Sequence, residues 1–357
     1  MKKKIQKMNF TGKTIFIGLD VHMTTWHATM IYEEVKTSKS FKASAEEFHR
    51  YLTNSYPGAK YKVAYESGYT GYTAYEQLSD LGMDVIVVNP SDVPTTDKDS
   101  RTKTDKIDSK KLAMSLKGGL LRSIFVPSRI QQNDRFLIRR RRSARKDETR
   151  VKNRIKAFCA QQGINLRDDF PDNRSHWSKK FILWLRSIKI KYSAGQYALD
   201  SLLRDLNHYR GEILLLTKQI RALSKSQRYS RLYKILISVP GVGLITSMTY
   251  LTEIGGLERF ETPDKLLSYI GLVPTEHSSG SKQSTGHMNK RQNKYLRSMT
   301  VEAAWVALRC DPVLAACYNH ARERMPSQKA IIKVARKLVT KIYYIWSNDK
   351  IYEKGII

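Results

Sequence analysis

The order of apolar runs and helical periodicities between residues 14 and 117 most constrains what this chain can fold into. Three strand patterns come first, TIFIGLD, TWHATMIY and KSFKA, over residues 14–20, 25–32 and 39–43. Helical and strand patterns then alternate, over residues 45–54, 62–67, 73–81, 84–89 and 105–117. Because each helix must bury its apolar side against a sheet, this order predicts a mixed α/β domain.

Three consecutive strands followed by alternating helix and strand are the element order of a ribonuclease-H-like α/β domain, which we assign to residues 1–128. The opening segment MKKKIQKMNFTGK is charged like the start of a signal peptide, but the apolar run after it is short and ends at Asp20. We therefore interpret that run as the first strand. No stretch approaches the roughly 18 apolar residues of a membrane span, so no membrane partner is expected.

After Pro127 the sequence has helical patterns instead of strands. Sparse apolar residues among basic ones predict a long exposed helix, and apolar positions three and four apart over residues 195–224 predict a helical hairpin or coiled coil that packs on another copy. We assign residues 129–228 to this helical segment. Residues 229–357 form a third, mostly helical domain, which contains a polar, glycine-bearing loop over residues 274–293.

The chain has a large excess of positive charge, with 63 Lys and Arg against 33 Asp and Glu and a formal charge of +30. Nucleic acid is the commonest partner that neutralises such a charge. We predict RNA or DNA contacts on helices over residues 135–156 and 329–341, and the alternative is that these are solvated helix faces. The first helix includes four consecutive arginines, Arg139, Arg140, Arg141 and Arg142.

The chain has three cysteines, Cys159, Cys310 and Cys317, which lack the paired spacing of a zinc site and are too few for a disulfide framework. This usage is typical of a reducing cytosol, and a cytoplasmic protein is expected. We expect all three cysteines to be core residues.

Two carboxylates three residues apart stand out in the lysine-rich segment TKTDKIDSKKLA. On a helix, Asp105 and Asp108 lie on one face with Cβ atoms roughly 5–6 Å apart. One interpretation is that they are first-turn acids that stabilise the helix dipole. The other is that they face a common ligand.

Asp20 and Glu66 favour the second interpretation, because each ends a predicted strand and the two strands are neighbours in a ribonuclease-H-like sheet. Two carboxylates about 4 Å apart repel each other by about 4 kcal/mol at an effective dielectric constant near 20. Oxygen ligands in this number suit Mg²⁺, and two such ions about 4 Å apart promote phosphoryl transfer. We therefore predict a site for Mg²⁺ formed by Asp20, Glu66, Asp105 and Asp108.

Two further motifs lie in the last third of the chain. SVPGVGLITS resembles the hairpin of a helix-hairpin-helix element, in which Gly241 and Gly243 let backbone N–H groups approach a phosphate; the alternative is a plain helix connection capped by Gly241. Ser278 and Ser279 precede Gly280, and are either turn residues or a nucleophile in a cationic pocket. The basic residues around these serines are Lys282, Lys290, Arg291, Lys294 and Arg297.

Taken in order and spacing, seven motifs resemble the DEDD transposases, the recombinases of insertion sequences that work with a bridge or seeker RNA. They are FIGLDVH, AYESGYTGY, KTDKIDSKKLA, LISVPGVG, LTEIGGLERF, YIGLVPTEHSSG and LRSMTVEAAW. The resemblance covers most of the chain apart from the first dozen residues and much of the helical middle. It implies a RuvC-like N-terminal domain, a dimerising coiled coil and a C-terminal transposase domain.

By this resemblance the metal-binding acids are Asp20, Glu66, Asp105 and Asp108, and the nucleophile is Ser279, with Ser278 as the second candidate. The implied reaction is attack by the serine hydroxyl on a DNA phosphodiester, through a phosphoserine link, with strand exchange and religation. The guide RNA would pair with donor and target DNA, so that the protein reads mainly shape and backbone. A homodimer or homotetramer acting on the prokaryotic nucleoid is also implied.

The chain departs from the family pattern at two positions. Gln292 stands where the family usually has glycine, which would allow a positive φ. Ser109 stands where alanine is common, a difference that we expect to matter little. Two alternative functions remain: a structure-selective, Mg²⁺-dependent junction nuclease that uses only the acids and water, and a non-catalytic RNA- or DNA-binding protein.

Overall fold

The computed structural model describes residues 9–94, 104–170, 177–279, 282–288 and 292–355. The chain divides into two compact units, residues 1–126 (unit 1) and residues 127–357 (unit 2), and each is described by itself.

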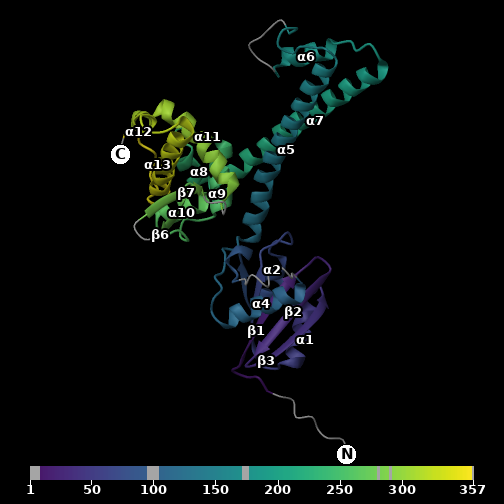
Figure 1. Ribbon diagram of the computed structural model, residues 1–357, viewed down its shortest axis with the longest axis vertical. Coiled ribbons are helices and arrows are strands. Elements are labelled where there is room, and N and C mark those ends of the chain that lie inside the picture. The colour runs from purple at the N-terminus through teal and green to yellow at the C-terminus, as the bar shows by residue number, and fades with distance from the viewer. Residues whose placement is uncertain (1–8, 95–103, 171–176, 280–281, 289–291, 356–357) are drawn as a thin grey trace, which may run out of the picture. The chain divides into compact units, whose positions relative to one another are not determined.

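A five-stranded sheet forms the centre of unit 1 (Figure 1), in the order β3-β2-β1-β4-β5. Neighbouring strands are antiparallel from β1 to β3, whereas β4 is parallel to β1 and β5 is parallel to β4. The predicted α/β class is confirmed. The strands are β1 Thr14–Val21, β2 Thr25–Tyr32, β3 Val35–Lys42, β4 Lys60–Glu66 and β5 Asp84–Val88.

Helices pack on both faces of this sheet because successive residues of β1 point to opposite sides. One face buries Ile15, Ile17 and Leu19 in the same apolar core as Phe48 and Leu78, from two of the helices. The opposite face carries a third helix, whose predicted range of 105–117 agrees with the structure at both ends. The helices are α1 Ala45–Ser55, α2 Thr73–Asp80, the 3₁₀ helix η1 Pro90–Asp92 and α4 Asp105–Lys117.

Unit 2 is mostly helical, as predicted. Two long helices, α5 Arg129–Gln161 and α7 Ser193–Ser224, lie side by side, and α6 Lys179–Ser187 packs at one end of the pair (Figure 1). Ile138 of α5 and Ile220 of α7 belong to the main apolar core of the remaining helices. These are α8 Gln227–Leu236, α9 Leu244–Ile254, α10 Pro263–Ile270, α11 Lys294–Cys310, α12 Pro312–Arg322 and α13 Ser327–Ser347.

Two expectations about unit 2 are wrong. The segment predicted as a polar loop contains an antiparallel pair, β6 Pro274–Ser279 and β7 Lys282–Met288, because a ladder is formed by backbone groups and does not require apolar side chains. Of the three cysteines, Cys159 is buried, Cys317 is half-buried and Cys310 is exposed at the end of α11. Among the described residues, no helix is both long and apolar enough to span a membrane.

Candidate functional site

The register of the sheet places two of the predicted acids at the same level. β1 and β4 are parallel, and their last paired residues are Leu19 and Tyr65. Asp20 and Glu66 follow these residues directly, so both stand at the carboxyl ends of adjacent strands. Since paired residues of parallel neighbours share a face, both acids belong to the face that carries α4.

The position of α4 depends on a glycine in β1. A Cβ built on Gly18 would lie 2.0 Å from the Ser109 carbonyl oxygen and 2.4 Å from the Ala113 nitrogen. Only a residue without a side chain permits this approach of helix and sheet. Ser109 is fully buried here, and its hydroxyl is 2.9 Å from Thr29 Oγ1 of β2. Serine at this position thus makes a contact between α4 and β2 that alanine would lack, which argues against the expectation that the difference matters little.

The first turn of α4 brings its two acids to the end of β1. Thr104 is the N-cap and accepts a hydrogen bond from the Ile107 amide at 3.3 Å. Asp20, His22 and Asp105 each offer one potential ligand atom, and these atoms lie within 4.8 Å of one another. His22 Nε2 is 3.4 Å from Asp20 Oδ2 and 3.8 Å from Asp105 Oδ1.

The electrostatics of this cluster favour a cation. Burial raises the pKa of Asp20, the Asp105 and Asp108 charges raise it further, and the neighbouring His22 opposes these effects. Asp108 also lies 3.7 Å from Lys111 Nζ, one turn along α4. Because a divalent cation would relieve the repulsion that disfavours the Asp20 carboxylate, these residues fit a metal site of the kind expected.

The prediction and the geometry differ in part. Asp20 and Asp105 are brought together, and Asp108 is within electrostatic reach of Asp20. Glu66 stands at the adjacent strand end but is not a member of the three-residue group. His22 was missed, although residues two apart at a strand end point to the same side, and that spacing from Asp20 was a usable signal.

Ser278 and Ser279 end β6, where they pair with Gln283 and Lys282 of β7. Lys290 and Arg291 lie outside the described residues. Arg297 Nη1 donates to Gln292 Oε1 at 2.5 Å, next to Gly271, the C-cap of α10. Gln292 is not among the described non-glycine residues with positive φ, which are Glu33, Trp177 and Asp349, so its departure from the family pattern requires no left-handed backbone here.

The two glycines of the hairpin between α8 and α9 play different parts. Gly241 has φ +81°, and a Cβ on it would lie 2.2 Å from the Ala303 carbonyl oxygen of α11. Gly241 thus serves close packing within unit 2. Gly243 is the N-cap of α9, and a Cβ there would meet nothing within 4 Å. Of the two, Gly243 has the open surroundings that a phosphate contact needs.

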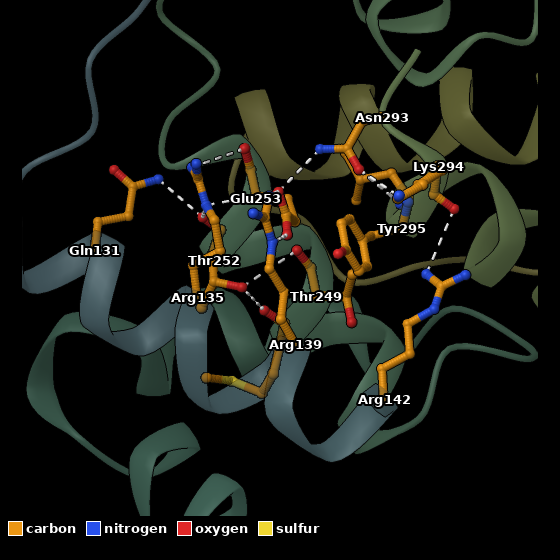
Figure 2. Close-up of polar contacts among 12 residues, drawn as sticks. Gln131, Arg135, Arg139, Arg142, Thr249, Thr252, Glu253, Asn293, Lys294 and Tyr295 are labelled. Carbon is orange, nitrogen blue, oxygen red and sulfur yellow. Dashed lines mark hydrogen bonds and ion pairs between the residues drawn. The ribbon is translucent and has the colours of Figure 1, made fainter. Parts of the chain in front are cut away.

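The four consecutive arginines of α5 all have intramolecular partners. Arg139 donates from Nε and Nη2 to the two carboxylate oxygens of Glu253, at 2.7 and 2.8 Å (Figure 2). Arg141 Nε donates to a threonine of α7, Thr217 Oγ1, at 2.7 Å. Arg140 lies 3.7 Å from Glu212, and Arg142 stacks on the Tyr295 ring. Arg139 in particular is bound to a carboxylate of unit 2, a partner that sequence reasoning did not predict.

Two family profiles match the chain. The profile described as the transposase IS116/IS110/IS902 family matches residues 233–319. A DEDD transposase profile of the IS110 type matches residues 17–162, which include all four predicted acids. The profiles thus cover the acid cluster of unit 1 (Asp20, Glu66, Asp105 and Asp108) and the serine hairpin of unit 2 (β6 and β7, which contain Ser278 and Ser279).

Named bacterial transposases are similar over much of the chain. A Sinorhizobium fredii protein named as a transposase, y4qE, is 32% identical over 241 residues, or 68% of this chain and 57% of that protein. The transposase for insertion sequence element IS1533 of Leptospira borgpetersenii is 25% identical over 82% of this chain and 85% of its own length. A family 20 transposase of Pseudomonas aeruginosa is 24% identical over 95% of this chain and 98% of its own length.

Proposed function

We propose that this chain, whose two units match transposase profiles of the IS110 type, is an RNA-guided DNA recombinase of an insertion sequence with a serine nucleophile. The convergence of Asp20 and Asp105 at the end of β1 is the observation that supports this function most. Both belong to the DEDD set, and they come from a strand and a helix 85 residues apart in sequence. The sheet order β3-β2-β1-β4-β5 supports the ribonuclease-H-like, RuvC-like assignment of unit 1.

Asp20, Glu66, Asp105 and Asp108 would hold Mg²⁺, with two ions per site. When bound, such ions stabilise charge on the oxygens around a phosphorus atom during phosphoryl transfer. The acids themselves fix the position of the cations, because Asp20 is held by the sheet and Asp105 by the packing of α4 on Gly18. Basic residues of unit 2 would hold the nucleic-acid backbone.

Ser279 is the proposed nucleophile, and Ser278 is the second candidate. The serine Oγ forms a bond to the phosphorus of a DNA phosphodiester, and the bond from that phosphorus to one deoxyribose oxygen breaks. The serine proton is lost to solvent, and the departing oxygen takes up a proton. A hydroxyl of the exchanged strand then attacks the phosphoserine, which restores a phosphodiester and frees the serine, so no external energy source is needed.

A guide RNA is proposed as the partner that reads sequence, by pairing with donor and target DNA. The chain's formal charge of +30 suits the binding of several nucleic-acid strands. Because the acids and the serine belong to different units, we propose that active sites are completed across protomers of a homodimer or homotetramer, joined through the α5–α7 coiled coil. The setting would be the prokaryotic cytoplasm, on nucleoid DNA.

The decisive experiment is to trap a covalent protein–DNA adduct. The purified protein, with any co-purified RNA, is incubated with Mg²⁺ and a plasmid that carries the DNA flanking its gene, then denatured and resolved by electrophoresis. We expect an adduct that disappears with EDTA, in Asp20→Ala and in Ser279→Ala, and persists in Ser278→Ala. Cleavage without an adduct would support the junction nuclease, and binding without cleavage would support the non-catalytic alternative.

A further inference from the structure

A buried glutamate, Glu253, contacts Asn293, a residue that follows the serine hairpin in the chain. It is the next-to-last residue of α9, and its side chain is 1% exposed. Its Oε1 accepts from Arg139 Nε at 2.7 Å, and its Oε2 accepts from Arg139 Nη2 at 2.8 Å and Asn293 Nδ2 at 2.9 Å (Figure 2). One carboxylate therefore joins α5, α9 and the start of α11.

Asn293 is the point where the chain returns from the hairpin. Its backbone amide donates to the Tyr269 carbonyl at 3.0 Å, so the residues before β6 and after β7 are held together there. Tyr269 Oη in turn donates to the Glu253 carbonyl oxygen at 3.2 Å. Asn293 Oδ1 also caps α11, accepting from the Tyr295 and Leu296 amides. The Asn293 side chain thus binds Glu253 through Nδ2 and caps α11 through Oδ1.

Two more residues on the same face of α5 bind the backbone of α9. Gln131 Nε2 and Arg135 Nε both donate to the Thr252 carbonyl oxygen, at 3.0 and 3.1 Å. Arg139 stacks on the Tyr295 ring, with its guanidinium carbon 4.5 Å from the ring centre. These residues recur at four-residue intervals, so one stripe of α5 is matched to α9 and to the first turn of α11 (Figure 2).

We infer that Glu253 is a positioning residue for the serine hairpin, and this inference rests on the proposed function. Burial of an ion pair adds little net stability, because desolvation offsets the attraction, whereas its geometry is strict. The Glu253 carboxylate accepts from two elements at once, which fixes the Asn293 side chain, and the Asn293 amide pairs with the Tyr269 carbonyl on the other side of the hairpin in the chain. A shift of about 1 Å at a reacting group lowers a rate by about 100-fold.

Asn293→Asp tests the inference, because aspartate still caps α11 but presents an oxygen to Glu253 where the amide donated. In the adduct assay we expect the rate of adduct formation to fall by about 100-fold, while DNA affinity in a filter-binding assay stays close to wild type. Amide hydrogen exchange across β6 and β7 should become faster. Asn319→Asp, which adds the same charge at an exposed position of α12, should change none of these.

Rescue by exchange of the two groups separates positioning from general damage to the fold. In Asn293→Asp combined with Glu253→Gln, the glutamine can donate to the new carboxylate, and adduct formation should recover at least tenfold over Asn293→Asp alone. A wild-type rate and unchanged exchange in Asn293→Asp would overturn the positioning role, as would the absence of rescue. If the wild-type protein forms no adduct, the proposed function fails. Amide hydrogen exchange still tests the positioning role in that case, because unchanged hydrogen exchange in Asn293→Asp would contradict it.

Discussion

The backbone of Gly18 in β1 lies against the backbone of Ser109 in α4, so closely that an added Cβ would be 2.0 Å from the Ser109 carbonyl oxygen. This contact sets the distance between the sheet and the helix that carry Asp20 and Asp105. The acid cluster depends on this contact, because any side chain at Gly18 would move α4 away from the sheet.

Gly18→Ala is expected to destabilise unit 1 and to separate the acids. Overpacking of this kind costs about 1–3 kcal/mol. Thermal unfolding should show the loss of stability, and Mn²⁺ titration followed by electron paramagnetic resonance should show weaker metal binding. Gly68→Ala is the control, since a Cβ there would meet nothing nearer than 4.0 Å. Equal melting temperatures for Gly18→Ala and wild type would contradict the prediction.

Ser109→Ala is expected to destabilise unit 1 by about 1 kcal/mol, because it removes the buried hydrogen bond between the Ser109 hydroxyl and Thr29 Oγ1. Thr29 keeps its second contact, at 2.9 Å from Ser38 Oγ, so it is not left without a partner. Urea unfolding of Ser109→Ala, Thr29→Val and the double variant measures the coupling between the two side chains. Additive changes would show that the hydroxyls do not interact.

Gly241→Ala should destabilise unit 2, whereas Gly243→Ala should not. Gly241 combines φ +81° with a Cβ position 2.2 Å from the Ala303 carbonyl oxygen, so its substitution should lower the free energy of unfolding of unit 2 by more than about 1 kcal/mol. Gly243 has room for a methyl group, and its substitution should leave stability unchanged. A lower DNA affinity of the stable Gly243→Ala protein would identify the start of α9 as a phosphate contact, and an unchanged affinity would exclude it.

Asp311, the buried N-cap of α12, should make stability depend on acid pH. Burial raises the pKa of its carboxyl, but hydrogen bonds from Tyr352 Oη and from the Leu314 and Val313 amides outweigh burial, and the pKa falls below its ordinary value of 3.8. The carboxylate therefore contributes stability above about pH 3.8, which is lost as the pH falls through the lower folded-state value.

Asp311→Asn keeps a capping side chain and removes the charge. We expect the variant to be less stable than wild type by about 2 kcal/mol at pH 7, and the difference to shrink toward pH 3. Urea unfolding at the two pH values measures this. A difference that stays constant with pH would mean that the charge on Asp311 contributes nothing.

Three lysines of α13, Lys329, Lys333 and Lys337, are exposed and recur every four residues, so they form one basic stripe. If each contacts a phosphate of duplex DNA, replacing all three by alanine should reduce the slope of log K against log salt concentration by about 2.7. Arg139→Met is the comparison, because Arg139 is engaged by Glu253 and should leave the slope unchanged. An unchanged slope in the triple variant would show that the stripe is a solvated face.

Local patterns were enough to predict most secondary structure. The ranges of β2 and α4 agree at both ends with the expected ones, because alternation along a strand and periodicity along a helix are properties of neighbouring residues. The polar β6–β7 pair was missed because it lacks the apolar alternation that marks a half-buried strand. The likeness to DEDD transposases was also readable from short motifs.

Tertiary structure decided which of the candidate residues meet. His22 joins Asp20 and Asp105 only because α4 lies on the sheet at Gly18, and Arg139 finds Glu253 across 114 residues of sequence. The nucleic-acid contacts of the α5 arginines were predicted from charge alone. Packing gave Arg139 an internal partner instead, since a buried carboxylate must be matched by a donor, and the chain's fold determines which donor is within reach.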